Sequence, residues 1–418
     1  MSNGIAVVGV TLVMAAVAFE SSVPGPKPIL DPSQGDGGVS AFYVWDKEVP
    51  GTPGRLLRQE PLPESLMLVN ASKGLRVLYT STNGIDGKTS ITVSGAIYFP
   101  KGTAPSEGWP VVAWGHGHTG VADVCAPSWA PRRQRDIDYL NAWLDQGYAI
   151  VATDYQGLGT PGGHPWGVLK AEGYSLIDSV RSAMTAFRQL SNSVVFIGQS
   201  QGSRAVLFAS LVAQQYAPTL RLKGTVATGV TAGPPFAPET KAKQIPVPPL
   251  AGGGANARLA VESLFRFRAL DPSFHPADYL SDAAKPAFEA ARTACNAAIE
   301  QAVNQNGVTT ENVFRTNPEA AATKAAPYLR YPRPKFVHPI FIGTGLDDVT
   351  AYPEGQYNFI MAACYEGSTV EAHYYAGKDH SAAVNASLVD SVPFVRKILA
   401  GQQIISNCDQ VRPPSSVH

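Results

Sequence analysis

The sequence predicts an α/β fold in which a mostly parallel, doubly wound sheet is covered by helices on both faces and carries an inserted helical segment. Three short apolar runs, at residues 110–114, 148–153 and 194–197, are the first observation. Continuous apolar runs of this length are typical of strands that are buried on both faces. Helical patterns over residues 171–190 and 203–216 follow the second and third runs. This alternation indicates βαβ units and therefore a parallel sheet.

Composition and charge limit the classes of function. The chain has 418 residues, of which 44% are hydrophobic and 16% are charged, so it has ample material for a buried core. Lys+Arg and Asp+Glu are both 33, which gives a formal net charge of zero. A neutral surface without basic runs gives nucleic-acid binding no electrostatic support and suits a neutral or amphiphilic substrate.

The N-terminus carries an apolar segment over residues 5–18, and Glu20 is the first charged residue. As a helix this segment is about 21 Å long, shorter than the ~30 Å hydrocarbon core of a bilayer. We interpret it as the core of a signal peptide that is cleaved after residue 18, which predicts a secreted or cell-envelope protein. No positively charged residue precedes the segment, and a buried or interfacial helix is the alternative.

The remaining elements follow in chain order. A Pro/Gly-rich leader over residues 21–38 is expected to be irregular, and residues 77–80 and 92–99 are expected to be early strands. After residue 232 the alternation stops, and an Ala-rich stretch carries helical patterns at 258–270 and 287–303. We interpret this stretch as an inserted helical cap.

Strand patterns resume at 339–342 and 370–375, and a final helix is expected at 391–399. The predicted organisation is a signal peptide at 1–18, an N-terminal extension at 19–74, the first part of the core at 75–232, a helical cap or lid at 233–334, and the second part of the core with the C-terminal tail at 335–418.

A glycine-flanked serine lies between a predicted strand and a predicted helix, in the run Gly198-Gln199-Ser200-Gln201-Gly202. This is the context of the nucleophile elbow of α/β-hydrolases, in which flanking glycines let a strained turn expose the serine hydroxyl. The helix N-terminus favours developing negative charge. We predict that Ser200 is a nucleophile; the alternative is a tight turn with a capping serine.

A serine nucleophile needs a base and an orienting acid, which follow it along the chain in this fold. His380 lies in a loop just after a predicted strand, whereas His373 lies inside that strand, so we predict His380 as the base. Asp347 and Asp348 compete for the acid. We favour Asp348 because hydrolases of this class usually place the acid in a Gly-x-x-Asp loop, and Gly345 stands three residues before it.

The negatively charged oxygen of an acyl-transfer intermediate needs backbone N–H donors. We predict the N–H of Gln201, which follows the nucleophile, and the N–H of His118, in the Gly-rich loop 115–120. His116 and His118 also form a possible metal pair, but no third ligand suggests itself. We therefore predict no metal site.

Four cysteines are present: Cys125, Cys295, Cys364 and Cys408. An even count in an exported chain predicts disulfides, and four cysteines allow three connectivities. No Cys-x-x-Cys pair occurs, so zinc or thioredoxin-like chemistry has little support. Four free buried thiols are the alternative.

Taken together, these motifs resemble the secretory lipase family of fungi and actinobacteria. The resemblance is carried by residues 115–120 with 125–128, by 153–159 with 164–165, and by 198–202. It implies an α/β-hydrolase core with a helical lid, a triad of Ser200, Asp348 and His380, carboxylic-ester substrates that are often lipids, and no cofactor.

The resemblance also implies that Cys125 pairs with Cys295 and that Cys364 pairs with Cys408. One departure concerns His118, because a smaller residue such as Thr is usual at that position of the family.

We therefore expect a secreted lipase or esterase that forms an acyl-enzyme on hydrophobic esters. Its expected partners are an ester substrate and a lipid–water interface, with no nucleic acid and no membrane span in the mature chain. An acyltransferase with the same triad is one alternative. A non-catalytic binding protein on the same scaffold is the other, although such proteins commonly lack a triad member, and here all three candidates are present.

Overall fold

The structure is a computed structural model that describes residues 23–416 with the exception of 25, 26, 28, 232–241, 243 and 249–253. The predicted signal peptide and its cleavage site lie outside the described residues.

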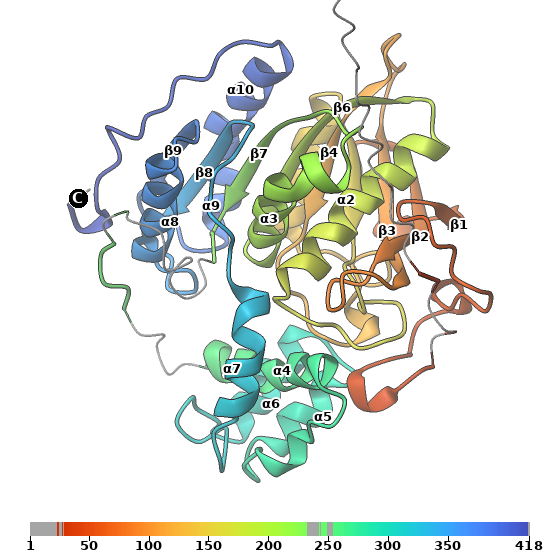
Figure 1. Ribbon diagram of the computed structural model, residues 1–418, viewed down its shortest axis with the longest axis vertical. Coiled ribbons are helices and arrows are strands. Elements are labelled where there is room, and N and C mark those ends of the chain that lie inside the picture. Colours follow the sequence, from red (N-terminus) through yellow and green to blue (C-terminus); the bar gives the residue numbers. More distant parts are fainter. Residues whose placement is uncertain are drawn as a thin grey trace, which may run out of the picture.

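One sheet dominates the described part of the chain (Figure 1). Its nine strands run in the order β1-β2-β3-β5-β4-β6-β7-β8-β9. β1, β2, β3 and β5 pair antiparallel in succession, and β5 to β9 form a parallel array, so the predicted α/β class with a mostly parallel sheet is confirmed. In sequence order the strands are β1 (Leu56–Pro61), β2 (Ala71–Thr82), β3 (Ser90–Pro100), β4 (Trp109–Gly115), β5 (Ala149–Thr153), β6 (Leu190–Gln199), β7 (Leu222–Thr228), β8 (Ile340–Gly345) and β9 (Val370–Tyr375).

Helices cover both faces of this sheet. They are α1 (Gln134–Asp145), α2 (Leu169–Ala186), α3 (Gln201–Tyr216), α8 (Pro353–Tyr365), α9 (Ala382–Ala386) and α10 (Leu388–Leu399). Side chains alternate between faces along a strand. In β4, Val111 and Ala113 therefore pack in the apolar cluster shared with α2, α3 and α8, whereas Val112 and Trp114 pack in the cluster shared with α1, α9 and α10.

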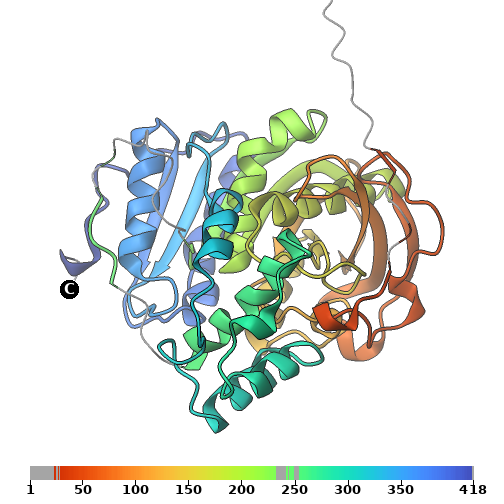
Figure 2. The same cartoon turned by 60° about the horizontal axis from the view of Figure 1, so that its bottom comes forward.

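The helices between β7 and β8 gather at one end of the sheet, away from the helices that cover its faces (Figures 1 and 2). They are α4 (Gly254–Leu270), α5 (Lys285–Ala291), α6 (Asn296–Gln305) and α7 (Glu319–Leu329), and we call them the cap helices. They have an apolar core of their own, which includes Val261, Leu264 and Ile299. Short 3-10 helices complete the described elements: η1 (Pro32–Gln34), η2 (Ala41–Tyr43), η3 (Glu64–Leu66), η4 (Asp123–Cys125), η5 (Pro276–Asp278) and η6 (Pro414–Ser416).

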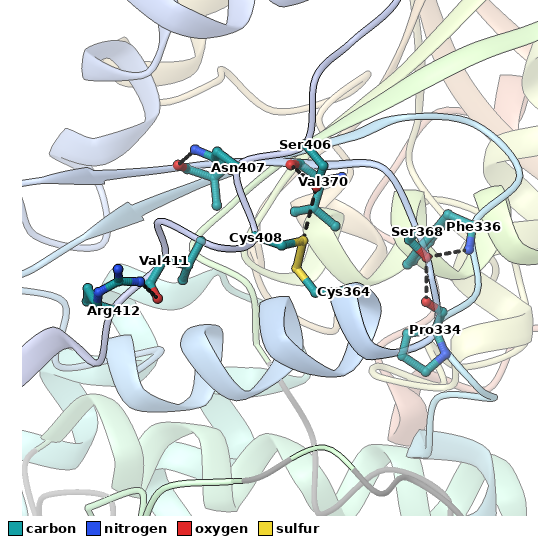
Figure 3. Close-up of a disulfide and its surroundings, with 11 residues drawn as sticks. Pro334, Phe336, Cys364, Ser368, Val370, Ser406, Asn407, Cys408, Val411 and Arg412 are labelled. Carbon is teal, nitrogen blue, oxygen red and sulfur yellow. Dashed lines mark hydrogen bonds between the residues drawn. A yellow bond between two sulfur atoms is a disulfide. The ribbon is translucent and has the colours of Figure 1, made fainter.

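Two disulfides join distant parts of the described chain. Cys125, in a core loop, is bonded to Cys295 at the start of α6, and Cys364 of α8 is bonded to Cys408 of the C-terminal tail. Figure 3 shows the second disulfide and the tail beside it. The side chain of Asn407 exchanges two hydrogen bonds with the backbone of Ala372 in β9, at 2.8 and 2.9 Å. The tail therefore covers the exposed edge of the last strand.

Of the helices in the described ranges, none is both long enough and apolar enough to cross a bilayer.

Candidate active site

Ser200 sits at a sharp turn between β6 and α3. Its φ is 57° and its ψ is −117°, a backbone conformation that a residue with a side chain rarely adopts. A Cβ on Gly202 would collide with the backbone carbonyl of Gly115, so the neighbouring strand end leaves room only for glycine there. The sequence motif therefore forms the strained elbow that the spacing predicted.

His380 and Asp348 form a short hydrogen bond. Nδ1 of His380 lies 2.7 Å from Oδ2 of Asp348, whose residue is 1% exposed. The other oxygen, Oδ1, accepts the backbone N–H groups of Thr350 and Ala351 at 2.8 and 2.7 Å. Asp347, the competing carboxylate, is exposed to solvent. The structure thus brings Asp348 to His380 and leaves Asp347 outside the site.

The imidazole of His380 is also held by its surroundings. Gly229, just after β7, has a φ of 55°, and a Cβ there would lie 2.8 Å from Cε1 and 2.9 Å from Nδ1 of His380. The side chain of Gln199 donates to the backbone carbonyl of His380 at 3.3 Å. Nε2 of His380 is buried and has no hydrogen-bond partner within the described ranges, so it remains free to take a proton.

The three triad candidates come from the carboxyl ends of neighbouring strands. Ser200 follows β6, Asp348 follows β8 and His380 follows β9, and β6-β7-β8-β9 are adjacent in the sheet. Parallel strands bring the loops at their carboxyl ends to the same edge, which is where α/β folds place their ligands. The sheet order therefore gathers residues that lie far apart in sequence.

The two other histidines considered above, His373 and His116, are held by contacts within the folded core and lie apart from the His380–Asp348 pair. His373 stacks on Phe341 at 5.3 Å between ring centroids, and its hydrogen bond to Glu371 raises its pKa. The ring of His116 lies 4.4 Å from that of Tyr155, at an angle of 32°, and burial lowers the pKa of His116 to about 3, so this imidazole is neutral. Over the described ranges, no group of three or more His, Cys, Asp or Glu side chains is arranged to hold a metal ion.

The loop after β4 carries His118. Within the described part of the chain its backbone N–H makes no hydrogen bond, and the N–H of Gln201, in the first turn of α3, has no acceptor in its own helix. The side chains of these two residues contact each other, since Nδ1 of His118 lies 3.1 Å from Oε1 of Gln201. The pair of residues predicted to supply the oxyanion donors is therefore linked through its side chains.

A polar network surrounds this pair. Nε2 of His118 lies 3.0 Å from Oε2 of Glu262, in cap helix α4. Nε2 of Gln201 donates to Oε1 of Glu172 at 2.9 Å and lies 3.1 Å from Nε2 of His164. Burial lowers the pKa of His164 to about 4, so its imidazole is neutral. Its Nδ1 lies 2.7 Å from the carbonyl oxygen of Gln156 and carries the proton, so Nε2 accepts a hydrogen bond.

Several members of the site were not predicted from the sequence. Glu172 and Glu262 lie within helical stretches, where a carboxylate resembles any solvated charge, and Gln356, which donates to Asp348 at 3.2 Å, lies in α8 without a motif. His164 lies in one of the segments that carry the family resemblance, but the sequence pattern does not indicate its contact with Gln201.

A cavity of about 160 Å³ adjoins the loop 115–120, which carries the predicted oxyanion donor His118. The loop residues from His116 to Thr119 line one side, and Cys295 and Asn296 at the start of α6 line the other. The basic side chains of Arg132, Arg133 and Arg135 also contribute to its wall. The space lies between core and cap, where pockets for small ligands commonly occur.

A strained serine elbow and a His–Asp pair at the carboxyl edge of a mostly parallel sheet are the features of the α/β-hydrolases, and the fold places the chain in that class. Residues 96–314 match the secretory lipase family. The chain belongs to that family, and the resemblance found in its motifs is confirmed.

The chain is also similar to one protein sequence and to solved structures. Lipase 7 of Candida albicans is 36% identical over 101 residues, and the matched segment covers 23% of this chain and 22% of that protein. The crystal structure of Candida antarctica lipase A has a TM-score of 0.66 at 18% identity, covering 88% of this chain and 87% of that one. The rice cell wall degrading esterase LipA from Xanthomonas oryzae has a TM-score of 0.59 at 15% identity, covering 84% of this chain and all of that one. These structural likenesses establish the fold.

Proposed function

We propose that this member of the secretory lipase family is a secreted carboxylic-ester hydrolase, a lipase or esterase, in which Ser200 is the nucleophile, His380 the base and Asp348 the orienting acid. The observation that carries the proposal is the 2.7 Å hydrogen bond between His380 and Asp348 at the same sheet edge as the strained turn of Ser200. The names of the relatives, lipases and an esterase, point to the same chemistry.

The hydrogen bonds of Asp348 define the tautomer of His380. A carboxylate only accepts hydrogen bonds, so Nδ1 of His380 carries the proton and Nε2 has the free lone pair. Two backbone N–H groups and Gln356 also donate to Asp348, which fixes the orientation of its carboxyl group. His380 is therefore oriented as a base toward the sheet edge that carries Ser200.

The reaction follows in two halves. Nε2 of His380 takes the hydroxyl proton of Ser200 while Oγ attacks the ester carbonyl carbon, and the N–H groups of Gln201 and His118 stabilise the oxyanion. The intermediate then expels the alcohol, which receives the proton from His380. Water attacks the resulting acyl-enzyme with the same base, and the carboxylic acid leaves as Ser200 regains its proton.

The substrate and the compartment follow from the surroundings of the site. The cavity between the loop 115–120 and the cap has room for part of an ester. The hydrophobic acyl chain is proposed from the secretory lipase family and from the lipases among the relatives. The apolar segment at residues 5–18 and the two disulfides fit secretion into an oxidising compartment. We retain residues 233–334 as the proposed extent of the cap.

The test is hydrolysis of p-nitrophenyl esters with short, medium and long acyl chains by the wild type and by Ser200→Ala. We expect the substitution to lower kcat by about 10⁴-fold or more, because the nucleophile is removed while binding is kept. Circular dichroism serves as the control for folding, and the chain-length profile separates a lipase from an esterase.

Adding a competing alcohol and analysing the products distinguishes hydrolysis from acyl transfer. Full activity of Ser200→Ala would overturn the assignment of the nucleophile. A folded wild type that cleaves none of these esters would instead favour a binding protein.

A further inference from the structure

The hydrogen bonds of Gln201 determine what His118 donates. Nε2 of Gln201 faces two acceptors, Oε1 of Glu172 at 2.9 Å and Nε2 of His164 at 3.1 Å, so it is the amide nitrogen that points to the core. Oε1 of Gln201 is consequently the atom that faces His118, at 3.1 Å. Since a carbonyl oxygen only accepts, Nδ1 of His118 carries a proton.

The second nitrogen of His118 faces a carboxylate. Nε2 lies 3.0 Å from Oε2 of Glu262, in an ion pair that is not aligned as a hydrogen bond. A neutral imidazole with its proton on Nδ1 would direct the lone pair of Nε2 at this anion, which is repulsive. The two contacts together favour the doubly protonated, cationic form of His118.

Glu262 is suited to be the anion of this pair. The residue is completely buried in α4, and Arg258, one turn earlier, contacts the same oxygen at 2.5 Å. Burial alone would raise the pKa of the Glu262 carboxyl, but the positive charges of His118 and Arg258 outweigh it and lower that pKa. The carboxylate is therefore charged when the enzyme works near neutral pH.

The cap also holds the backbone of the oxyanion loop. Nδ2 of Asn296 donates to the carbonyl of His118 at 2.8 Å, and the N–H of Asn296 donates to the carbonyl of Thr119 at 3.1 Å. Arg258 donates to Oδ1 of Asn296 at 2.9 Å, so the same guanidinium orders both contacts. Side chain and backbone of His118 are thus fixed by one group of cap residues.

We propose that Glu262 is a positioning residue for the oxyanion hole: its ion pair with His118 couples the docked cap to the two residues whose N–H groups stabilise the intermediate. The inference rests on the proposed function. The imidazole of His118 presents one ring nitrogen to Gln201 and the other to Glu262, so a single side chain links the cap to the turn after Ser200.

The state of His118 depends on the charges around it. Several charged or titratable side chains face His118 or one of its direct partners. They are Glu262, Arg258 and Arg266 on α4, Glu172 on α2, Arg204 on α3, and His164 in the loop before α2. Of these, Glu262 is the carboxylate that contacts the imidazole of His118 directly, at 3.0 Å.

The experiment compares Glu262→Gln with the wild type. Glutamine keeps the shape and removes the charge. We expect kcat for a p-nitrophenyl ester to fall about 10-fold with KM changed less than about twofold, a fraction of the ~10²–10³-fold loss when an oxyanion donor is removed outright. Glu289→Gln is the matched control, since Glu289 is a cap carboxylate paired at 2.6 Å with Arg292 at the surface; its kcat should stay within about twofold of wild type.

A double-mutant cycle shows whether Glu262 acts through His118. Asparagine at position 118 keeps a donor near the place of Nδ1, toward Gln201, and loses the contact with Glu262. Glu262→Gln should therefore lower kcat in the wild-type background but change it less than about twofold in the His118→Asn background.

A wild-type kcat for Glu262→Gln, or equal losses in both backgrounds, would overturn the proposal. If Glu262→Gln does not fold, His118→Asn alone decides, because Glu262 keeps Arg258 as a partner there; a normal kcat would then refute the coupling. Ser200→Ala separates this inference from the proposed function. Loss of activity in Ser200→Ala together with a normal Glu262→Gln refutes only the coupling, whereas an active Ser200→Ala refutes the mechanism itself.

Discussion

Gly229 limits where the ring of His380 can lie. A methyl group at this position would come within 3 Å of the imidazole, at 2.8 Å from Cε1 and 2.9 Å from Nδ1. We expect Gly229→Ala to displace the ring and to lower kcat about 100-fold, since a shift of ~1 Å in a catalytic group costs that much. Steady-state kinetics measures the effect.

The control for backbone strain is Gly307→Ala. Gly307 has a φ of 58°, close to the 55° of Gly229, and a methyl group there would meet nothing within 4 Å. Both substitutions should cost roughly 1–2 kcal/mol of stability, as expected for an L-residue in the left-handed region. A kcat that falls equally in the two variants would show that strain, and not contact with His380, is responsible.

Local sequence patterns predict those site residues whose surroundings are formed by their neighbours in the chain. Ser200 stands in an elbow that five consecutive residues define. Asp348 and Asp347 were harder to separate, because adjacent carboxylates differ only in which of them is buried, and burial is a property of the folded chain. The contact of Glu262 could not be predicted from the sequence, because its partner His118 lies far away along the chain.

At the scale of elements, the two disulfides stabilise different parts of the molecule. One double variant, Cys364→Ser with Cys408→Ser, removes the C-terminal disulfide, and the other, Cys125→Ser with Cys295→Ser, removes the bond to the cap. Each should lower the free energy of unfolding by about 4 kcal/mol and Tm by several degrees. The reason is that the disulfides, across 44 and 170 residues, restrict the unfolded chain. Thermal unfolding measures this loss.

Kinetics should distinguish the two pairs. Cys295 precedes Asn296, which holds the backbone of His118, so loss of the first disulfide should also lower kcat several-fold. The C-terminal disulfide lies beside the edge of β9 and should leave kcat within about twofold of wild type below Tm. Equal kcat values in the two double variants would contradict the role given to the Cys125–Cys295 bond.

Element boundaries were predicted least well where tertiary contacts decide them. The helix expected at residues 287–303 is two helices, because Cys295 adopts an extended conformation where its disulfide meets the core. The early strand expected at 77–80 extends over all of β2, and β1 lies within the predicted N-terminal extension. The full length of this strand is not visible as an apolar pattern, because it contains buried hydroxyl residues such as Thr82, which lies beside Tyr216.

At the scale of the whole molecule, composition and periodicity predicted a parallel core and a helical insertion. They did not predict how the insertion docks, because docking depends on a few buried polar contacts. The contact between Glu262 and His118 and the contact between Asn296 and the same loop are examples. The same limitation applies to the segment that precedes β1, whose attachment to the core depends on a buried carboxyl group.

That group is Asp123, which is 1% exposed and accepts the N–H of Gly37 at 2.8 Å. Burial raises its pKa from 3.8 to about 7. Between these two values the unfolded chain releases this proton while the folded protein keeps it, so the contribution of Asp123 to stability is present below pH 4 and is lost as the pH rises through 7. The loss amounts to at most about 4 kcal/mol.

Asp123→Asn removes this ionisation and keeps the shape of the side chain. Its Tm relative to wild type should therefore rise by roughly 5 °C between pH 4 and pH 7.5, whereas Asp46→Asn, at an exposed position, should show a difference that is independent of pH. Differential scanning calorimetry across this range measures both variants. A constant difference between Asp123→Asn and wild type would mean that the carboxyl is already ionised at pH 4, and that the N-terminal segment is held by a charged group.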